Sequence, residues 1–331
     1  MSTKSDHSPT DPSATAAESF PPLVDEAIIL TGPTAAGKSA IALELAERIG
    51  GEILSLDSIA VYRGMDIGSA KPSPEERQRV THHLLDLVEP NEEFSVACYL
   101  REAHRIVAEL KQAGTPAIFV GGTPMFLKGV LRGFDPGPPA DWEFRRSVEE
   151  DIRRYGVEAL RARLIQVDPL AAHRIGPQDT RRMIRALEVA RHTGLPISHH
   201  QTQFDRHQKP ADCNVYCLAW PRPQLHQRIN QRVHKMFAAG LLDEVRKLVT
   251  TYGGLSRTAS QAVGYREVLQ WLKEIGDKEV LIEEVSAHTR QLARRQETWF
   301  RSFHEISSID VADPLETSEV VDKIVQAMGP A

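Results

Sequence analysis

The segment from Gly32 to Ser39 constrains the fold more than any other part of the chain, because it fits the phosphate-binding pattern G-x-x-x-x-G-K-[ST]. The apolar run at 27–30 before it suits a buried strand, and residues 41–49 after it carry apolar side chains at helical spacing. A strand, a glycine-rich loop and a helix N-terminus together bind phosphate through backbone N–H groups and the helix dipole. We therefore expect an α/β protein with a P-loop-containing parallel-sheet core.

The residues of this pattern have separate expected roles in binding a diphosphate or a nucleotide. Lys38 adds a full positive charge to the backbone donors, and the hydroxyl of Ser39 is placed to hold Mg²⁺. The plain alternative is a glycine turn with an incidental lysine, which the flanking strand and helix argue against. The expected diphosphate or nucleotide site consists of Gly32, Pro33, Thr34, Ala35, Ala36, Gly37, Lys38 and Ser39.

A second strand is expected at 52–56, and Asp57 follows directly after it. In open α/β sheets, ligands lie outside the carboxyl ends of the strands, so Asp57 should face the phosphate site. Its carboxylate could act as a general base or orient a substrate. Alternatively, Asp57 is the N-cap of the next helical turn, since aspartate favours that position. Position alone leaves both interpretations open.

Residues 61–72 form a polar, glycine-containing stretch that predicts a long loop over the site. His82 and His83 precede a possible short strand at 84–87, and adjacent residues of a strand point to opposite faces. We therefore expect core or surface histidines here and no shared metal ion.

An amphipathic helix is expected at 96–113, followed by a strand at 116–120 that runs into Gly121 and Gly122. Two glycines at the carboxyl end of a strand suggest that the backbone approaches a ligand closely. This strand lacks the terminal aspartate of a typical Walker B motif, which argues against an NTP-hydrolysing motor.

A proline-rich break at 135–139 divides the chain. Residues 1–22 are rich in Ser, Thr, Pro and Ala and predict a disordered tail, and residues 23–134 predict the first part of the core. Residues 135–205 lose strand signals and predict a helical, arginine-rich insertion domain. Residues 206–331 return to the core with another strand and end in C-terminal helices, one of them basic.

Two helical segments group arginines in a way that suits RNA. In the insertion, Arg181 and Arg185 share one face of a predicted helix. In the segment 280–303, basic and aromatic side chains interleave, and unstacked RNA bases can stack on such surfaces. The members of this second group are Arg290, Arg294, Trp299, Phe300 and Arg301. The alternatives are a solvated helix face in the insertion and core aromatics in the C-terminal helix.

The overall composition excludes several classes of protein. The net charge of −5 gives no global sign of nucleic-acid binding, so a basic surface must be local. The three cysteines form no C-x-x-C pair, and an odd number fits a reducing compartment. No run approaches the roughly 18 apolar residues of a membrane span, and the N-terminal segment lacks the features of a signal peptide or presequence. We therefore expect a cytoplasmic protein that does not bind membranes.

Several long motifs, in order, closely resemble the tRNA dimethylallyltransferase (tRNA isopentenyltransferase) family. They are GPTAAGKS at 32–39, DSIAVYRGMDIGSAKP at 57–72, VGGT at 120–123, RMIRALEV at 182–189, VGYR at 263–266 and RQLARRQETW at 290–299. The resemblance runs from about residue 26 to about residue 303. Eukaryotic members often add a C-terminal Cys/His zinc finger, and this chain, which has no such cysteines, resembles the bacterial form.

The resemblance implies a prenyl transfer. The donor would be dimethylallyl diphosphate, and the acceptor would be the N6 amine of the adenine 3′ of the anticodon (tRNA position 37) in tRNAs that read codons starting with U. The product would be N6-dimethylallyladenosine. The P-loop would hold the diphosphate leaving group, with Mg²⁺, rather than ATP. The implied partners are the tRNA anticodon stem-loop and dimethylallyl diphosphate, with the protein acting as a monomer.

The resemblance also implies roles for individual residues. Asp57 would be the base that accepts a proton from the adenine amine, Arg232 would clamp the diphosphate, and Thr34 would touch the donor or the metal shell. Further residues fall on the RNA-contacting segments of the family. They are Asp57, Ser58, Ile59, Ala60, Thr123, Arg145, Arg181, Arg182, Met183, Ile184, Arg185, Gln261, Ala262, Val263, Gly264, Tyr265, Arg266, Arg294, Arg295, Gln296, Glu297, Thr298, Trp299, Phe300 and Arg301.

Three other functions fit parts of the pattern. An adenylate isopentenyltransferase uses the same donor with a free nucleotide, but the arginine-rich insertion argues against it. A P-loop kinase of a small metabolite shares the phosphate site. A non-catalytic RNA-binding protein with a relict P-loop is the third, and the intact Lys38, Ser39 and Asp57 argue against it.

Overall fold

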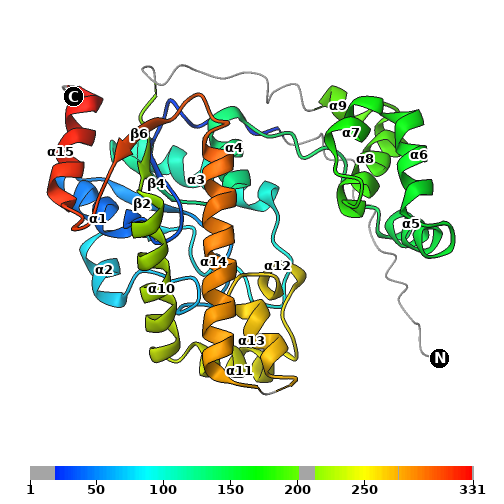
Figure 1. Ribbon diagram of the computed structural model, residues 1–331. Helices are drawn as coiled ribbons and strands as arrows, with labels where there is room; N and C mark the ends of the chain where they lie inside the picture. The colour runs from blue at the N-terminus through cyan, green and yellow to red at the C-terminus, as the bar shows by residue number, and fades with distance from the viewer. Residues whose placement is uncertain (1–18, 201–212, 275, 330–331) are drawn as a thin grey trace, which may run out of the picture. The chain divides into compact units, whose positions relative to one another are not determined.

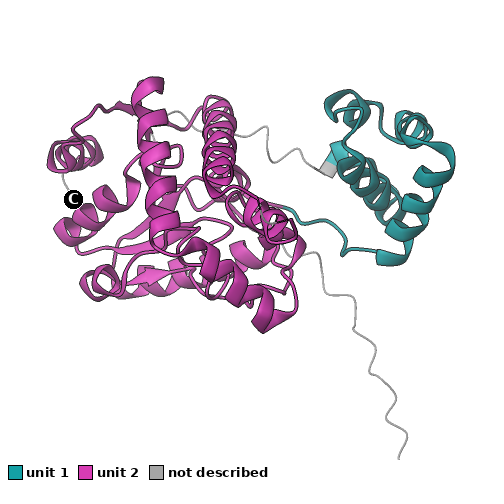
Figure 2. Cartoon of the chain, turned by 60° about the horizontal axis from the view of Figure 1, so that its bottom comes forward, with its two compact units in different colours: residues 1–19, 135–205 teal, residues 20–134, 206–331 magenta. Residues whose placement is uncertain are grey.

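The computed structural model describes residues 19–200, 213–274 and 276–329. The chain divides into two compact units (Figure 2). The first, here called the core unit, comprises residues 20–134 and 206–331. The second, here called the insertion unit, runs from Asp135 to Asp205, of which residues 135–200 are described.

The core unit is built on a six-stranded sheet in the order β3-β2-β4-β1-β5-β6, and every pair of neighbouring strands is parallel. The predicted α/β class with a parallel sheet is therefore confirmed. All four residues of β1 are buried, as expected of a parallel strand that is covered on both faces. The strands are β1 (Ile28–Thr31), β2 (Glu52–Leu56), β3 (His82–His83), β4 (Ala117–Gly121), β5 (Val215–Ala219) and β6 (Ser307–Asp310).

Helices cover both faces of the sheet (Figure 1). Side chains alternate between the faces along each strand, so that Ile28 and Leu30 pack in one cluster and Ile29 packs in the other. The first face is covered by α1 (Lys38–Ile49), the beginning of α10 (Arg222–Ala238) and α15 (Thr317–Met328). The second face is covered by α3 (Val96–Ala113) and α4 (Pro124–Arg132).

A third cluster, here called the helical cluster, joins the end of α10 to four further helices. These are α11 (Leu241–Tyr252), α12 (Arg257–Ser260), α13 (Tyr265–Trp271) and the first half of α14 (Lys278–Phe300). Val61, Tyr62 and Met65, which begin the predicted loop 61–72, are buried in this cluster. The loop is thus anchored in helices that lie far from it in sequence, and it leads into α2 (Pro74–Arg79).

The insertion unit is entirely helical in its described part, with a core of its own. That core contains Phe144, Leu160, Leu164, Met183 and Ile184. Each of α5, α7 and α8 begins with an aspartate whose side chain accepts a hydrogen bond from a backbone N–H of the first turn. The helices are α5 (Trp142–Tyr155), α6 (Val157–Val167), α7 (Pro169–Arg174), α8 (Thr180–Thr193) and α9 (Ile197–His200).

The structure corrects two sequence-based expectations. The possible strand at 84–87 is wrong, because Leu84 and Asp86 adopt φ values of 60° and 54°, which extended backbone excludes. The predicted tail is too long at its end, because Phe20 is 5% exposed and exchanges two backbone hydrogen bonds with Phe134. Burying an aromatic ring is favourable enough to hold this stretch on the core. Residues 1–18 lie outside the described part of the chain.

Candidate active site

The P-loop joins β1 to α1, and its backbone is held from outside in a strained conformation. Ala35 has a φ of 64°, in the left-handed region that non-glycine residues rarely occupy. Its carbonyl accepts a hydrogen bond from Nε of Arg228 (3.0 Å), and the carbonyl of Ala36 accepts one from Nε1 of Trp220 (3.0 Å). The Arg228 guanidinium stacks over the Trp220 ring at 4.4 Å. These contacts direct the two carbonyls to the outside of the loop.

Two further side chains stabilise the P-loop through hydrogen bonds: Lys38, within the loop itself, and Gln296, from α14. Lys38 Nζ donates to the carbonyls of Gly32 (2.9 Å) and Pro33 (2.8 Å). Gln296, on α14, accepts a hydrogen bond from the Thr34 N–H (2.9 Å) and donates to the Gly122 carbonyl (2.8 Å). Gln296 therefore ties the P-loop to the loop after β4.

A cavity of about 530 Å³ opens beside the P-loop at the carboxyl ends of β1, β2 and β4. Three groups of residues line it: the P-loop from Thr34 to Ser39, the turn at Asp57 and Ala60, and the loop residues from Ser69 to Pro72. The fourth wall is one face of α10. That face contributes Arg228, Gln231, Arg232 and Lys235.

The Asp57 side chain both caps the turn that follows it and lines the cavity. Its Oδ1 accepts hydrogen bonds from the backbone N–H groups of Ile59 (2.7 Å) and Ala60 (3.3 Å), as a capping residue does. Within the described residues, Oδ2 accepts no hydrogen bond, and the side chain lines the cavity. One oxygen is therefore fixed by the turn, while the other is available to a ligand.

The cavity holds positive charge that lacks a full counter-charge. Burial and, to a smaller extent, the nearby positive charge of Arg232 lower the pKa of Lys38 to about 8, against the opposing attraction of the Asp57 carboxylate. Burial likewise lowers the pKa of Arg232, again against the attraction of Asp57. A dianionic or trianionic ligand in this cavity would relieve the repulsion between the two cations.

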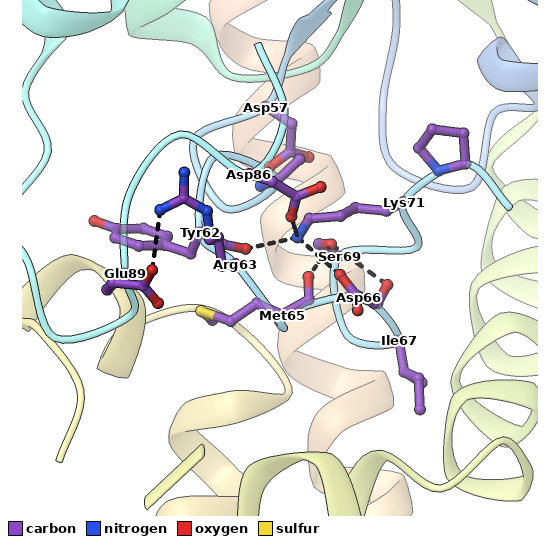
Figure 3. A network of polar contacts seen from close by, with 12 residues as sticks. Asp57, Tyr62, Arg63, Met65, Asp66, Ile67, Ser69, Lys71, Asp86 and Glu89 are labelled. Carbon is purple, nitrogen blue, oxygen red and sulfur yellow. Dashed lines mark hydrogen bonds and ion pairs between the residues drawn. The ribbon is translucent and has the colours of Figure 1, made fainter. Parts of the chain in front are cut away.

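Sequence reasoning assigned no role to two cations of the cavity, Arg228 and Lys235. They lie four residues before and three residues after Arg232, whose role the family resemblance implied, so the three share a helix face, and this spacing would have identified the other two. Lys71 also lines the cavity, but its Nζ donates to the Tyr62 carbonyl (2.6 Å), Asp66 Oδ1 (2.8 Å) and Asp86 Oδ1 (2.6 Å). Figure 3 shows this network, in which all three ammonium hydrogens already have acceptors.

The two glycines at the carboxyl end of β4 have a packing role as well as a place in the cavity wall. A Cβ at Gly121 would lie 2.3 Å from the backbone oxygen of Leu56, so the close approach is to the neighbouring strand. Gly121 and Gly122 still line the cavity. Thr123 accepts a hydrogen bond from the Ser58 N–H at Oγ1 (3.0 Å), which places it beside the Asp57 turn.

Several predicted RNA-contacting residues of the core unit are buried instead. Gln296 is 8% exposed and braces the P-loop, and Phe300 is 5% exposed in the second face of the sheet. Tyr265 and Ala262 are buried in the helical cluster. Packing and internal hydrogen bonds already engage these four side chains in this conformation, and RNA contact by their segments stays a prediction.

Other predicted contacts of the core unit are accessible. Ser58, Ile59, Val263, Arg266, Glu297 and Trp299 are half-buried, whereas Gly264 is buried. The exposed members are Gln261, Arg294, Arg295, Thr298 and Arg301. The exposed arginines on α14 keep the predicted basic surface, while the aromatic part of that prediction is reduced to Trp299.

In the insertion unit, the predicted arginines fall into two classes. Arg145 and Arg185 both pair with Glu188, which is fully buried, and Arg185 also donates to the carbonyls of Pro136 and Pro138. Arg181 and Arg182 are exposed on α8. The side chains of Met183 and Ile184 are buried in the core of this unit, and RNA contact by their segment stays a prediction.

The described part of the chain contains neither a metal-binding cluster of side chains nor a membrane-spanning helix. No group of three His, Cys, Asp or Glu side chains there could hold a metal ion, and His83 instead pairs with Glu52 (2.6 Å). Within the same residues, no helix is both long and apolar enough to cross a membrane.

Sequence families match most of the chain. The family described as IPP transferase matches residues 60–303, and the family described as isopentenyl transferase matches residues 25–92. A tRNA dimethylallyltransferase of Rhodopirellula baltica is 53% identical over 322 residues, which cover 95% of this chain and 96% of the relative. A tRNA dimethylallyltransferase of Geobacter sulfurreducens is 45% identical over 274 residues, covering 83% and 88%.

Solved structures of tRNA prenyltransferases also match this chain. The tRNA isopentenylpyrophosphate transferase of Bacillus halodurans matches with a TM-score of 0.66 at 35% identity, over 92% of this chain and 97% of that one. A eukaryotic dimethylallyltransferase acting on tRNA matches with a TM-score of 0.75 at 23% identity, over 92% and 80%, and shares the fold.

Proposed function

Because this chain belongs to the tRNA dimethylallyltransferase family, we propose that it transfers a dimethylallyl group from dimethylallyl diphosphate to N6 of the adenine 3′ of the anticodon (tRNA position 37). The tRNAs would be those reading codons that start with U, and the product would be N6-dimethylallyladenosine. The observation that carries the proposal is the shared cavity, which brings Lys38, Arg232 and Asp57 together.

The cationic side of the cavity suits the leaving group. As the bond between the allylic carbon and oxygen breaks, negative charge grows on the diphosphate, and preorganised donors stabilise it most at that moment. Lys38 and Arg232 supply two cations, and P-loop N–H groups supply further donors. Loss of one such donor costs roughly 3 kcal/mol of transition-state stabilisation. Thr34, on the same wall, would contact the donor.

The residues present fit a Mg²⁺ ion that is held mainly by the substrate. The hydroxyl of Ser39 lies on the cavity wall beside Lys38, and magnesium binds oxygen ligands, keeps several waters and often relies on substrate phosphates. Ser39 would therefore hold the ion together with diphosphate oxygens. The ion would neutralise charge on the leaving group.

Asp57 is the proposed base. The exocyclic amine of adenine is a weak nucleophile, so its proton must be accepted as the new carbon–nitrogen bond forms. The Oδ2 oxygen would accept that proton, while Oδ1 is held by the hydrogen bonds of the turn and keeps the carboxylate in place. The adenine must leave the base stack to reach this carboxylate, which costs a few kcal/mol.

The grip on tRNA would offset that cost. We assign it to the exposed arginines of α8, Arg181 and Arg182, and to Arg294, Arg295 and Arg301 on α14. Such contacts bind the phosphate backbone and position the anticodon stem-loop. On this proposal, the insertion unit is a tRNA-binding domain within a cytoplasmic, monomeric enzyme.

The assignment is tested with labelled substrates. Dimethylallyl diphosphate labelled in the allyl group is incubated with the protein and with tRNA, AMP or buffer, and γ-labelled ATP is used in a parallel series. Label should enter tRNA alone, and mass spectrometry should place it on the adenine 3′ of the anticodon. Label in AMP would indicate an adenylate isopentenyltransferase, and phosphate transfer from ATP would indicate a kinase.

A further inference from the structure

The loop 61–72 forms a wall of the cavity without being a regular element. Ser69, Ala70, Lys71 and Pro72 line the cavity directly. Ala70 has a φ of 51°, so the segment is strained at the point where it meets the ligand space. Such a conformation persists only where its surroundings enforce it.

A single carboxylate of α11 holds the turn that directly precedes Ala70. Glu244, in the first turn of α11, accepts hydrogen bonds from the backbone N–H groups of Asp66 (3.0 Å), Ile67 (2.7 Å) and Gly68 (3.3 Å). Successive N–H groups that converge on one anion form a strong backbone nest. The turn at 66–68 is therefore built around Glu244.

Tyr265 orients that carboxylate. Its hydroxyl donates to Glu244 Oε1 at 2.6 Å, and its ring is fully buried. The turn also packs directly on the ring, since a Cβ at Gly68 would lie 2.3 Å from Tyr265 Cε2. Both a hydrogen bond and a steric contact thus fix the position of the turn.

The same turn reaches the cationic side of the cavity. The Ser69 carbonyl, one residue after the nest, accepts a hydrogen bond from Arg232 Nη2 at 3.4 Å. On the other side of the turn, Lys71 ties Asp66 to Asp86 (Figure 3). A shift of the turn would therefore move the carbonyl that orients Arg232.

We propose that Glu244, oriented by Tyr265, is a positioning residue that holds the turn at 66–69 and thereby sets Arg232 for the diphosphate. The inference rests on the proposed function for the identity of the anion. It also gives Tyr265, within the segment expected to contact RNA, a different role: it links the helical cluster to the donor side of the cavity.

The test is a double-mutant cycle with inorganic pyrophosphate and Mg²⁺ as the ligand, measured by calorimetric titration. Glu244→Gln alone should weaken pyrophosphate binding about fivefold, the effect of losing one ordinary hydrogen bond. In an Arg232→Ala background, Glu244→Gln should have no further effect, because the residue acts through Arg232. Tyr265→Phe should follow the same pattern with a smaller effect.

Tyr252→Phe is the matched control. It removes a tyrosine hydroxyl that donates to a carboxylate, Glu89 Oε2, at the same 2.6 Å but away from the turn. Pyrophosphate affinity should not change. In steady-state transfer, Glu244→Gln and Tyr265→Phe should raise KM for dimethylallyl diphosphate and leave KM for tRNA unchanged. Glu244→Asp, which keeps a carboxylate, should bind pyrophosphate more tightly than Glu244→Gln and less tightly than the wild type.

The inference would be overturned if Glu244→Gln weakened pyrophosphate binding equally in the wild-type and Arg232→Ala backgrounds. An unchanged pyrophosphate affinity in the Tyr265→Phe protein would overturn it as well. If Glu244→Gln does not fold, the Tyr265→Phe cycle decides alone. Pyrophosphate binding does not require prenyl transfer. A wild-type protein that binds pyrophosphate but transfers no allyl group would therefore refute the proposed function and leave this inference to its own test.

Discussion

At the scale of single residues, the cavity separates two kinds of task. Lys38 and Arg232 are half-buried cations whose pKa values are lowered by desolvation, and the charge of Arg232 lowers the pKa of Lys38 further, so both favour an anion between them. Asp57 is anchored by one oxygen and leaves the other open. This division lets one side stabilise a departing anion while the other accepts a proton.

Asp57→Asn tests the base without disturbing the turn. The amide oxygen can still accept the hydrogen bonds of Ile59 and Ala60, so the fold should be kept, but the side chain can no longer take up a proton. The single-turnover rate of transfer should fall about 10²- to 10⁴-fold, with tRNA affinity within about twofold of wild type. A near-normal rate would remove Asp57 from the chemistry.

At the scale of elements, the arginines of α8 differ in whether their side chains are paired within the protein or exposed to solvent. Arg185 is committed to Glu188 and to two carbonyls, so it holds the helix against the segment that enters the insertion unit. Arg181 and Arg182, on the same helix, remain exposed. Replacing Arg185 would therefore confuse a loss of stability with a loss of RNA contact, and the exposed pair gives the cleaner test.

Arg181→Ala with Arg182→Ala should weaken tRNA binding and reduce the slope of log K against log salt by about 2, since each phosphate contact contributes nearly one unit. Filter binding over a series of salt concentrations measures both quantities. Lys323→Ala, which removes an exposed cation from α15, is the control and should leave the slope unchanged. A double variant with the wild-type slope would contradict RNA contact by α8.

Because of the ion pairs of Glu188, we expect the insertion unit to become less stable in acid. Burial tends to raise the pKa of Glu188, but hydrogen bonds from Arg145 and Arg185 outweigh it, so its pKa lies below the ordinary value of 4.5. The ion pairs therefore stabilise the fold above pH 4.5, and this contribution is lost as the pH falls below it. Glu188→Gln should cost about 3 kcal/mol at neutral pH.

Thermal unfolding of the wild type and Glu188→Gln at neutral pH and near pH 3.5 measures the difference. The difference in stability between the two proteins should narrow as the pH falls below 4.5, because each proton that the wild-type carboxylate takes up removes the charge that Arg145 and Arg185 pair with. A gap that is independent of pH would show that the carboxylate charge does not stabilise the unit.

At the scale of the whole molecule, the two units have separate hydrophobic cores. Leu164 is fully buried in the insertion unit, and Leu54 is fully buried under the sheet of the core unit. The cavity with its P-loop belongs wholly to the core unit. Anion binding and the stability of the insertion should therefore respond to different substitutions.

Leu164→Ala should destabilise the insertion unit by about 2–5 kcal/mol through the cavity it leaves. Because the unit carries Arg181 and Arg182, tRNA affinity should fall, while pyrophosphate affinity should stay at the wild-type value. Calorimetric scans together with the two titrations measure these effects. Leu54→Ala is the size-matched comparison in the other core, and a loss of pyrophosphate affinity in the Leu164 variant would argue against separate units.

Local pattern was sufficient wherever the physical cause is local. The P-loop, the strand before it, the helix at 96–113 and the placement of Asp57 after a strand all follow from glycine geometry, apolar spacing and the rule for parallel sheets. The family resemblance rests on the same short segments. These features depend on neighbours within a few residues, so they can be read without knowing the fold.

Tertiary structure decided which polar and aromatic side chains are available. Spacing could not distinguish Arg185 from Arg181, because only the burial of Glu188 determines which arginine is used. Tyr265, Gln296 and Phe300 lie in motifs whose composition suits RNA contact. Their side chains instead hydrogen-bond to or pack against residues from distant segments of the chain. Long-range packing chooses such partners, and a periodic pattern specifies which face is apolar but not what will cover it.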